Sequence, residues 1–395
     1  MPRRSLVTDR RYVQVHYPWE ATFDAESAAP SAYLASLIRQ SLHYGMPARR
    51  YGVLGAWVVR RGMPSRLLLR MLRASHKGTR PDVDAILHDV SSGWNGLSEK
   101  CSRLPRTVPS HLSALMLKRR AANTTFVFGD GPQPLIVCKV AHGPVASLEN
   151  EDAALREAEP SGIAPRSLGK IGEMFVQQAL AGAPLEVAAV TVQSAQHLRW
   201  KPEHRKLAGA LVRLAETTRR PGAPREFSPD IAGALDGSDL PRKARAIARG
   251  ALRDLERFDL SILRHGDTSA QNCLFDDGEL TGLVDWEIAR PQGAPGFDTL
   301  NSAIALLDHG VGLVRWSEER ALECFRSAWQ RSSFFDDARA AARDATRAAG
   351  ASDQDYERLE VAFFARRLAS RIARPSSYAT GPRTAALMLE VACAH

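Results

Sequence analysis

One stretch of the chain, Leu263 to Glu287, constrains the fold more than any other. An apolar pair leads into His265-Gly266-Asp267, a second apolar run ends at Asp276-Asp277-Gly278, and a third leads into Asp285. Short apolar runs separated by Asp-Gly turn signals predict three strands joined by tight loops. The polar side chains therefore fall at strand ends, where a rigid scaffold holds a site in place.

The spacing of these polar groups indicates phosphoryl transfer. In such reactions one carboxylate orients the attacking hydroxyl, while an amide oxygen and a second carboxylate hold Mg²⁺ against nucleotide phosphates. In chain order, Asp267 would be the base, Asn272 the amide and Asp285 the metal carboxylate. An acidic surface loop with a chance asparagine is the alternative for any one of these residues. The combined pattern favours the catalytic interpretation.

These motifs resemble those of the aminoglycoside phosphotransferase family, which includes choline kinases and is related to the protein kinases. The family pattern His-x-Asp-x-x-x-x-Asn is matched by His265, Asp267 and Asn272. A hydrophobic-Asp-aromatic-Glu segment is matched by Asp285-Trp286-Glu287. A Pro-x-x-Asp-Leu segment is matched by Pro295 to Asp298, with its leucine one place late. The resemblance covers roughly Leu115 to the C-terminus.

The resemblance implies an α+β, protein-kinase-like fold of two lobes, with a small β-rich N-lobe and a larger helical C-lobe. We expect the N-lobe at residues 106–182 and the C-lobe, with the catalytic and metal loops, at residues 183–395. Residues 1–105 would form a basic, mainly helical N-terminal extension that the resemblance does not reach. The implied activity depends on ATP or GTP and Mg²⁺, with a hydroxyl of a small molecule as acceptor.

Three strands and a helix are predicted for the N-lobe. The strands fall near residues 115–117, 124–128 and 135–140, and the helix at about residues 145–158. Lys139 interrupts the buried-strand pattern and needs an anionic partner, because burying an ammonium group alone is costly. A lysine reaching out from an edge strand to water is the alternative. Lys139 matches the strand lysine that binds nucleotide phosphates in the family, and Glu151 is the helix glutamate we expect beside it.

The first hairpin departs from the protein-kinase pattern, because it lacks the glycine-rich loop that covers the phosphates. Asn123, Thr124 and Thr125 are the polar residues we expect to serve there instead. A strand near residues 174–176, followed by Gly182, resembles the hinge that binds the purine.

Helices dominate the remainder, at about residues 204–219, 240–258, 300–307, 318–330, 336–349 and 353–373. They would build the acceptor pocket. Arg366, Arg367 and Arg371 favour an acidic acceptor if they face the cleft, whereas solvated surface arginines are the commoner outcome.

The composition of the chain limits the class of protein, its binding partners and its expected location. The 395 residues are 44% hydrophobic and 25% charged, as in globular proteins. The net charge of +9 is concentrated in residues 1–100, which hold fifteen Lys and Arg against eight Asp and Glu. The catalytic region thus lacks the basic stripe of a nucleic-acid reader. The five cysteines are widely spaced, and no signal peptide or spanning segment is visible, so we expect reduced thiols and a cytoplasmic protein.

The N-terminal extension admits two interpretations. Residues 1–30 look irregular, and helices are predicted at residues 31–43 and 82–90, the second ending at Ser91-Ser92-Gly93. Between them, residues 50–73 contain two basic apolar segments. These segments either pack on the kinase domain, with arginine stems covering apolar area, or make a weak membrane-surface or protein contact.

Three functions are consistent with the sequence. The first is an active small-molecule kinase, supported by the presence of Lys139, Asp267, Asn272 and Asp285. The second is a non-catalytic, kinase-like binding protein that works through its extension. The third is a peripheral membrane kinase that acts on a lipid-linked or polysaccharide precursor, with residues 50–73 as its anchor.

Overall fold

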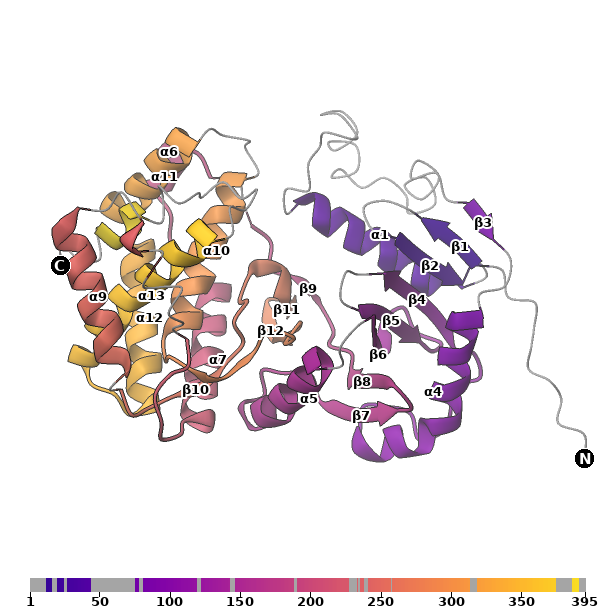
Figure 1. The fold of residues 1–395 in the computed structure, drawn as a ribbon. Helices are drawn as coiled ribbons and strands as arrows, with labels where there is room; N and C mark the ends of the chain where they lie inside the picture. Colours follow the sequence, from indigo (N-terminus) through magenta and orange to yellow (C-terminus); the bar gives the residue numbers. More distant parts are fainter. Residues whose placement is uncertain are drawn as a thin grey trace, which may run out of the picture. The chain divides into compact units, whose positions relative to one another are not determined.

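The computed structural model describes residues 12–15, 20–24, 27–43, 75–77, 81–118, 122–142, 146–187, 190–226, 233, 235–237, 241–256, 258–312, 318–373 and 386–390. The basic segments at residues 50–73 lie outside the described residues. The chain forms two compact units. The first unit comprises residues 1–152 and 165–181, and the second comprises residues 153–164 and 182–395. The fold class is as expected, with an antiparallel sheet in the first unit and a mainly helical second unit (Figure 1).

The first unit is built on one sheet of eight strands, all paired antiparallel in the order β3-β1-β2-β4-β5-β6-β8-β7. The strands expected near residues 115, 124, 135 and 174 are present as β4, β5, β6 and β8. The bounds are β1 Tyr12–Val15, β2 Glu20–Asp24, β3 Ser75–Lys77, β4 Ser113–Lys118, β5 Ala122–Phe128, β6 Pro134–Ala141, β7 Ser167–Ile171 and β8 Met174–Gln178.

The N-terminal residues do not behave as we expected. Residues 12–15 and 20–24 form strands instead of irregular structure, and β2 pairs with β4 from Glu20 opposite Lys118 to Phe23 opposite Leu115. Without β2, one edge of β4 would present a row of unpaired N–H and C=O groups. The described part of residues 1–105 is therefore mainly helical, as we expected, but it also contributes strands to the same sheet as the N-lobe.

Helices cover both faces of this sheet. Val127, Ile136 and Cys138 lie in one hydrophobic cluster with Trp94 and Leu97 of helix α4 (Pro81–Lys100). Side chains alternate along a strand, so Phe126 and Phe128 face the opposite side. There the ring of Tyr33, from helix α1 (Ala28–His43), lies 5.1 Å from Phe126 and 5.5 Å from Phe128.

Helix α4 continues past the end we predicted at Gly93. A Cβ atom at Gly93 would lie 2.9 Å from the Ile171 side chain, so this glycine allows the helix and strand β7 to approach closely. The following turns bury Trp94 and Leu97 against the sheet. The packing of this second half outweighs the low helix propensity of Ser91-Ser92-Gly93.

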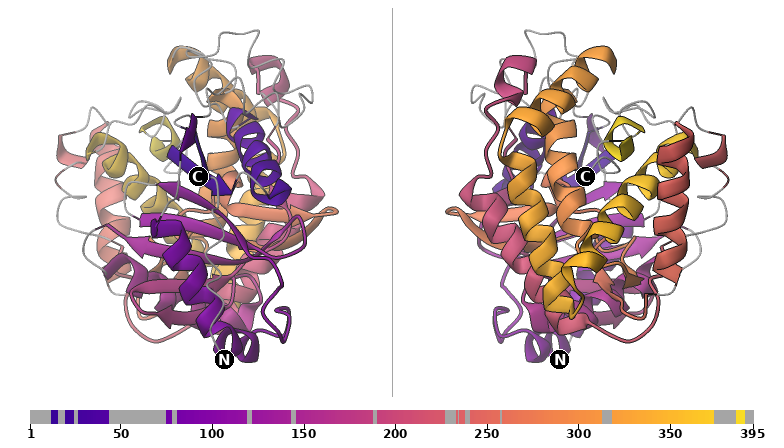
Figure 2. Two further views of the ribbon diagram at one scale, coloured as in Figure 1. Left: turned by 90° about the vertical axis from the view of Figure 1, so that its right-hand side faces the viewer. Right: turned by 90° about the vertical axis from the view of Figure 1, so that its left-hand side faces the viewer.

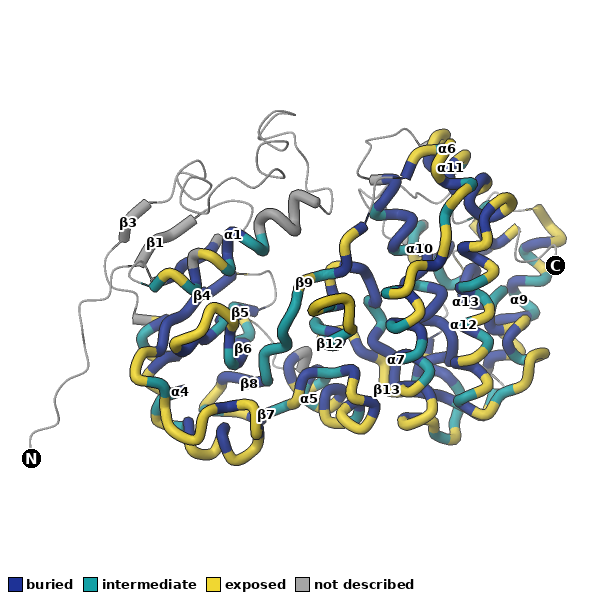
Figure 3. Tube along the Cα trace, turned by 180° about the vertical axis from the view of Figure 1, so that it is seen from behind, coloured by how far each residue is buried: buried dark blue, intermediate teal, exposed yellow. Residues whose placement is uncertain are grey.

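The second unit consists mainly of helices around a few short strands. The side views in Figure 2 show α12 and α13 beside one another. Helix α7 packs against α12, and helix α9 packs against α13. Figure 3 shows buried positions repeating along these helices, as expected for amphipathic helices in a bundle. The bounds are α6 Val192–Ala195, α7 Pro202–Thr218, α9 Arg242–Glu256, α10 Phe297–Gly312, α11 Glu318–Arg331, α12 Phe334–Ala349 and α13 Asp353–Ala373.

The strands of the second unit carry the motif stretch. Strand β10 (Ile262–Arg264) pairs with β13 (Arg290–Gly293), and β11 (Cys273–Asp276) pairs with β12 (Glu279–Leu283) and β9 (Ala183–Pro184). Ile262 packs in a small cluster with Ala215 of α7 and Ala345 of α12. The Leu263 N–H donates to the Thr218 hydroxyl at 3.1 Å. The strand that leads into His265 is thus fixed to two helices.

The four described cysteines, Cys101, Cys138, Cys273 and Cys324, are free and buried. Burial raises the pKa of the Cys138 and Cys273 thiols, so both stay neutral and act as core residues. Within the described part of the chain, no helix has the length and apolar character needed to cross a membrane.

The packing of α4 on the sheet gives the first prediction. Trp94 is fully buried and donates its indole N–H to the Pro105 carbonyl at 2.9 Å. Trp94→Ala should lower the free energy of unfolding by about 3–5 kcal/mol, because it leaves a cavity beneath the sheet. Urea denaturation followed by circular dichroism measures the loss. His88→Ala, on the exposed face of the same helix, should change it by less than about 0.5 kcal/mol. Equal effects of the two variants would mean that α4 does not help to hold the unit together.

Candidate active site

In the first unit, Lys139 and Glu151 form a buried ion pair. Lys139 is on β6 and Glu151 is on helix α5 (Ala146–Ala158). The Lys139 ammonium lies 2.7 Å from Oε1 and 2.8 Å from Oε2 of Glu151, and the two residues are 7% and 0% exposed. Lys139 follows Cys138, so its side chain lies on the sheet face opposite α4. The lysine does not reach out to water, and the partner we expected is in contact with it.

The polar residues expected to replace the glycine-rich loop lie elsewhere. Asn123, Thr124 and Thr125 belong to β5, whose backbone pairs with β4 on one side and β6 on the other. Thr125 is fully buried, and its hydroxyl has no hydrogen-bond partner among the described residues. The expectation is therefore wrong for the Thr125 hydroxyl, which is buried, while for Asn123 and Thr124 it stays a prediction. The loop itself, residues 119–121, lies outside the described part.

In the second unit, His265 ties the motif loop to the strand that leads to Asp285. Its Nδ1 accepts the Asp267 backbone N–H at 3.2 Å, and its Nε2 lies 2.9 Å from the Val284 carbonyl. A nitrogen that accepts an N–H carries no proton, so the neutral ring has its proton on Nε2 and donates to Val284. The ring also packs edge-to-face on Trp286, with centroids 4.6 Å apart. His265 is fully buried and holds the loop in place.

Asp267 and Asn272 are brought together at the end of β10. The Asn272 side-chain N–H₂ donates to the Asp267 carbonyl at 3.0 Å and to its carboxylate at 3.1 Å. Asp267 is half-buried, whereas Asn272 is 5% exposed and sits in a short 3₁₀ turn, Ala270–Asn272. Since the amide nitrogen is engaged, the side-chain oxygen of Asn272 is the atom directed elsewhere.

Asp285 has an unusual backbone conformation. Its φ of 71° lies in the left-handed region, which costs a residue other than glycine about 1–3 kcal/mol. The surroundings hold it there: the Val284 N–H donates to the Asn272 carbonyl at 2.9 Å, and the Trp286 indole N–H donates to the Leu283 carbonyl at 2.8 Å. The strand end that carries Asp285 is thus hydrogen-bonded to the residue that carries the amide.

Beneath this loop lies a network of buried charges whose pairing was not predicted from the sequence. Asp298, at the start of α10, accepts the N–H groups of His265 at 2.7 Å and Gly266 at 3.2 Å. The same carboxylate accepts Nε and Nη2 of Arg264 at 3.1 and 2.9 Å. One acidic side chain therefore fixes both the backbone of the motif loop and the side chain before it.

Arg264 has a second acidic partner. Its guanidinium is 1% exposed and also pairs with Glu226, which is 4% exposed and accepts the Ala294 N–H at 3.0 Å. Glu226 forms a further ion pair with Arg366 of α13 at 3.0 Å. An arginine directly after the apolar pair Ile262-Leu263 was the one signal of a buried charge. Nothing in the sequence pointed to Glu226 as its partner.

The arginines of α13 belong to ion pairs inside the second unit. Arg366 pairs with Glu226, while Arg367 and Arg371 lie 2.6 and 3.3 Å from the buried Asp308. They are therefore neither solvated surface groups nor uncompensated cations. The expectation of an acidic acceptor has no support from these residues, because each has a carboxylate partner.

The predicted site residues thus fall into two groups. Lys139 and Glu151 meet in the first unit, and Asp267, Asn272 and Asp285 meet, through the loop contacts above, in the second. The contacts join Lys139 to Glu151 and Asp267 to Asn272, and the roles of all five residues in binding and catalysis stay predictions.

The family model of the phosphotransferase enzyme family (APH) matches residues 116–361, well over half of the chain. The chain belongs to this family. The motifs in the sequence had indicated the same family, and the match includes every predicted site residue. The protein is therefore a phosphotransferase whose acceptor group is a small-molecule hydroxyl. No curated protein matches the chain.

Solved structures similar to this phosphotransferase include three kinases. A macrolide 2′-phosphotransferase from Brachybacterium faecium has 17% identity and a TM-score of 0.38, over 69% of this chain and 89% of its own. A putative fructosamine-3-kinase from Thermobifida fusca has 12% identity and a TM-score of 0.44, over 78% and 99%. A Plasmodium vivax ethanolamine kinase has 11% identity and a TM-score of 0.39, over 72% and 82%. Values this low say nothing about the substrate of this phosphotransferase.

The network beneath the loop predicts a specific response to acid. Burial would raise the pKa of the Glu226 carboxyl, but Arg264 and Arg366, with hydrogen bonds from Arg264 and Ala294, outweigh burial and lower it. A lowered pKa contributes stability that is present above the ordinary value of 4.5 and is lost as the pH falls. Glu226→Gln should cost about 3–5 kcal/mol of unfolding free energy at neutral pH, since it leaves a buried cation undercompensated.

Urea denaturation of both proteins at several pH values tests this. The difference between wild type and Glu226→Gln should narrow as the pH drops below about 4.5. Glu216→Gln, at an exposed position of α7, is the matched control and should change the free energy of unfolding little at any pH. A difference between wild type and Glu226→Gln that stayed constant with pH would contradict the assignment of a charged Glu226.

Proposed function

We propose that this protein transfers the γ-phosphate of ATP or GTP to a hydroxyl group of a small molecule, with Asp267 as the base. The observation that carries the proposal is the contact between Asp267 and Asn272 in a loop fixed by His265 and Asp298. Such a loop presents a carboxylate that accepts a proton and an amide oxygen of defined direction. The family match supports the class of reaction.

Asp267 is suited to act on the acceptor hydroxyl. Its carboxylate is half-buried, and the Asn272 N–H₂ donates to one of its oxygens. His265 cannot take the acceptor proton in its place, because both of its ring nitrogens are engaged and the ring is fully buried. The histidine therefore acts through the loop, and the aspartate acts on the substrate.

Lys139 is proposed to bind the nucleotide phosphates. The bidentate contact with Glu151 holds the ammonium in one direction within the sheet. In kinase-like folds this pair orients the phosphates for transfer. Glu151 is completely buried, so its charge stays tied to the lysine.

The donor set of the second unit fits Mg²⁺. The described residues contain no group of three or more His, Cys, Asp or Glu side chains that could hold a metal by themselves. A magnesium ion between a protein and phosphates needs only one or two oxygen ligands from the protein. Asn272, whose side-chain oxygen is directed by its engaged nitrogen, and Asp285, on its constrained backbone, would hold the ion. Bound there, it would neutralise charge on the phosphates.

The alternative functions are decided by experiment. A non-catalytic binding protein would lack one of the groups for base, metal or phosphate, and all of them are present. The membrane contact proposed for residues 50–73 lies outside the described residues and stays a hypothesis. Sedimentation of the protein with neutral and anionic liposomes tests it. The use of ATP or GTP as phosphate donor and the cytoplasmic location also stay predictions. The acceptor compound is to be identified by experiment.

The decisive variant for the proposed function is Asp267→Asn. The amide keeps the size of the side chain but removes the charge that accepts the proton, so kcat should fall about 10²–10⁴-fold. Nucleotide affinity should stay nearly intact, because this carboxylate acts on the acceptor. The assay needs an acceptor found in a panel of hydroxyl compounds. The matched control is Asp276→Asn, at the exposed last position of β11, which should keep wild-type turnover. Wild-type kcat in Asp267→Asn would rule out this base.

The metal assignment is tested separately by Asp285→Ala. Alanine removes one of the two proposed ligands, so calorimetry should show loss of Mg²⁺-dependent ATP or GTP binding. The measurement is made on protein whose circular dichroism matches that of the wild type. Metal-free nucleotide binding serves as the internal reference and should change less. Unchanged affinity for the magnesium–nucleotide complex would assign the ion to other residues.

A further inference from the structure

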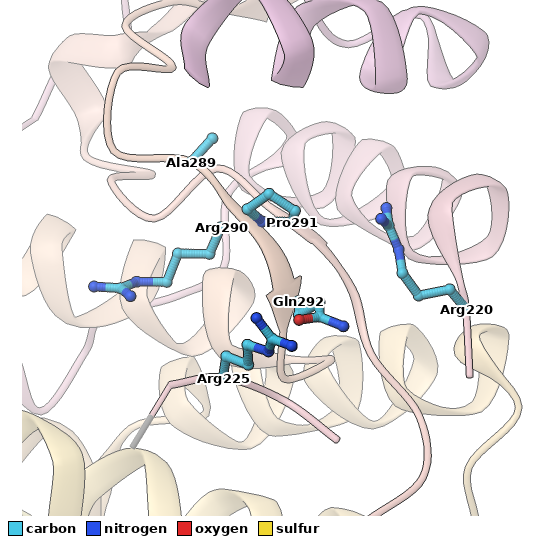
Figure 4. Close-up of a pocket in the computed structure, with 6 residues that line it drawn as sticks. All are labelled: Arg220, Arg225, Ala289, Arg290, Pro291 and Gln292. Atoms are coloured by element: carbon cyan, nitrogen blue, oxygen red, sulfur yellow. The ribbon is translucent and has the colours of Figure 1, made fainter. Parts of the chain in front are cut away.

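A small, open cavity in the second unit has three arginines among the six residues that line it. Its volume is about 390 Å³, it lies at the start of β13, and neither Asp267 nor Asn272 is among the residues that line it. Figure 4 shows Arg225 and Gln292 in the centre, with Arg220 and Arg290 on either side of them in this view. The residues that line it are Arg220, Arg225, Ala289, Arg290, Pro291 and Gln292.

The charge of this cavity is only partly compensated. Arg220 forms an ion pair with Glu157, and the nearby Asp259 accepts the Gly222 N–H at 2.9 Å. Arg225 and Arg290 are exposed, and neither has a carboxylate within ion-pair distance in the described part of the chain. Arg225 and Arg290 therefore line the cavity without an acidic partner among these residues, and in Figure 4 the Arg225 side chain lies beside Gln292 while Arg290 extends to the other side.

A neighbouring residue reports the same excess of positive charge. Burial lowers the pKa of Arg366 to about 10, and although Glu226 opposes this, Arg264 and Arg290 lower it further. Arg290 is thus close enough to repel a cation of the buried network. An anion bound at Arg290 would relieve this repulsion.

The backbone around the cavity is fixed. The Arg225 N–H donates to the Gln292 carbonyl at 2.7 Å, and Arg220 and Ser261 exchange two backbone hydrogen bonds of 2.9 and 3.0 Å. Arg290 lies opposite Arg264 in the pairing of β13 with β10. The arginines therefore extend from paired backbone, which lowers the entropic cost of arranging them around a ligand.

We propose that Arg220, Arg225, Arg290 and Gln292 form a binding site for an oxyanion of the phosphate class. A guanidinium presents a planar fork of N–H donors that matches phosphate oxygens, and the Gln292 amide adds a neutral donor. The cavity has room for a small ion and its waters. The site goes beyond the proposed catalytic function and shares none of its residues. Its occupant is either free phosphate-class anion from solution or an anionic group carried by the acceptor.

The test compares two double variants of the full chain. Arg225→Gln/Arg290→Gln removes the two guanidinium groups that lack partners, and Arg326→Gln/Arg331→Gln removes two exposed arginines of α11 as a matched control for charge. Calorimetry with inorganic phosphate and with tripolyphosphate at low salt measures affinity. The first variant should bind at least tenfold more weakly than wild type, because charged hydrogen bonds contribute about 1.5–3 kcal/mol each. The control should match wild type.

The nucleotide site also attracts phosphate, so the same titration is repeated in Lys139→Ala. Binding that depends on Arg225 and Arg290 should persist there. The proposal is overturned if Arg225→Gln/Arg290→Gln binds phosphate like wild type, if the control loses as much affinity, or if Lys139→Ala abolishes the binding. These outcomes are measured by binding and not by turnover. The anion site can therefore fail its test without affecting the test of the proposed function, in which Asp267→Asn should reduce kcat, and the reverse also holds.

Kinetics then distinguish the two sources of the anion. If phosphate inhibits wild-type turnover by competing with the acceptor, and no longer does so in Arg225→Gln/Arg290→Gln, the acceptor carries the anionic group. Phosphate that binds without competing indicates a free anion. Either result, when it depends on these two arginines, supports the site.

Discussion

The buried ion pair between Arg264 and Asp298 is the interaction on which the candidate active site depends. A guanidinium that is 1% exposed loses its hydration, and this costs several kcal/mol unless acidic groups replace the water. Asp298 replaces part of it and also accepts the N–H groups of His265 and Gly266. The same carboxylate that compensates the arginine therefore fixes the backbone immediately before Asp267.

Around this pair the network is nearly balanced in charge. Glu226 and Asp298 oppose Arg264 and Arg366, and all four belong to the second unit. Breaking such a set on one side is costly, because a buried charge is left without compensation. Close packing adds a steric limit: a Cβ at Gly293 would lie 2.4 Å from the Arg264 side chain, so β13 can pass the arginine only with glycine there. The position of the loop that carries Asp267 thus follows from charge and shape together.

Different interactions orient the side chains in the two groups of proposed site residues. In the first unit, strand alternation turns Lys139 away from the α4 face, and one buried glutamate fixes its direction. In the second unit, a hydrogen-bonded loop directs an amide and two carboxylates. Kinase chemistry relies on placing charges around phosphates more than on covalent steps. Both sets of interactions restrict charged groups to one direction, as this chemistry requires.

The sequence by itself determined the family and the fold class, and it supplied the residues that we propose carry the chemistry. Asp267 and Asn272 are five residues apart in a single tight loop, so local geometry alone brings them together. The alternation of β6 and the helix after it likewise allowed Lys139 and Glu151 to be matched. Local periodicity also placed most helices of the second unit, because each of them buries one amphipathic face.

Only the tertiary structure decided what lies across the chain. Arg264 meets Glu226 and Asp298 over separations of 38 and 34 residues, and no periodic pattern selects one acidic residue among many at such distances. Strand β2 carries little apolar alternation and becomes a strand because β4 offers an edge to pair with, and β1 then pairs with β2. The ion pairs of Arg366, Arg367 and Arg371 also depend on the tertiary structure, since their carboxylate partners Glu226 and Asp308 come from other elements. Contacts that depend on chain topology are fixed by the packing of the whole unit, and local sequence does not record them.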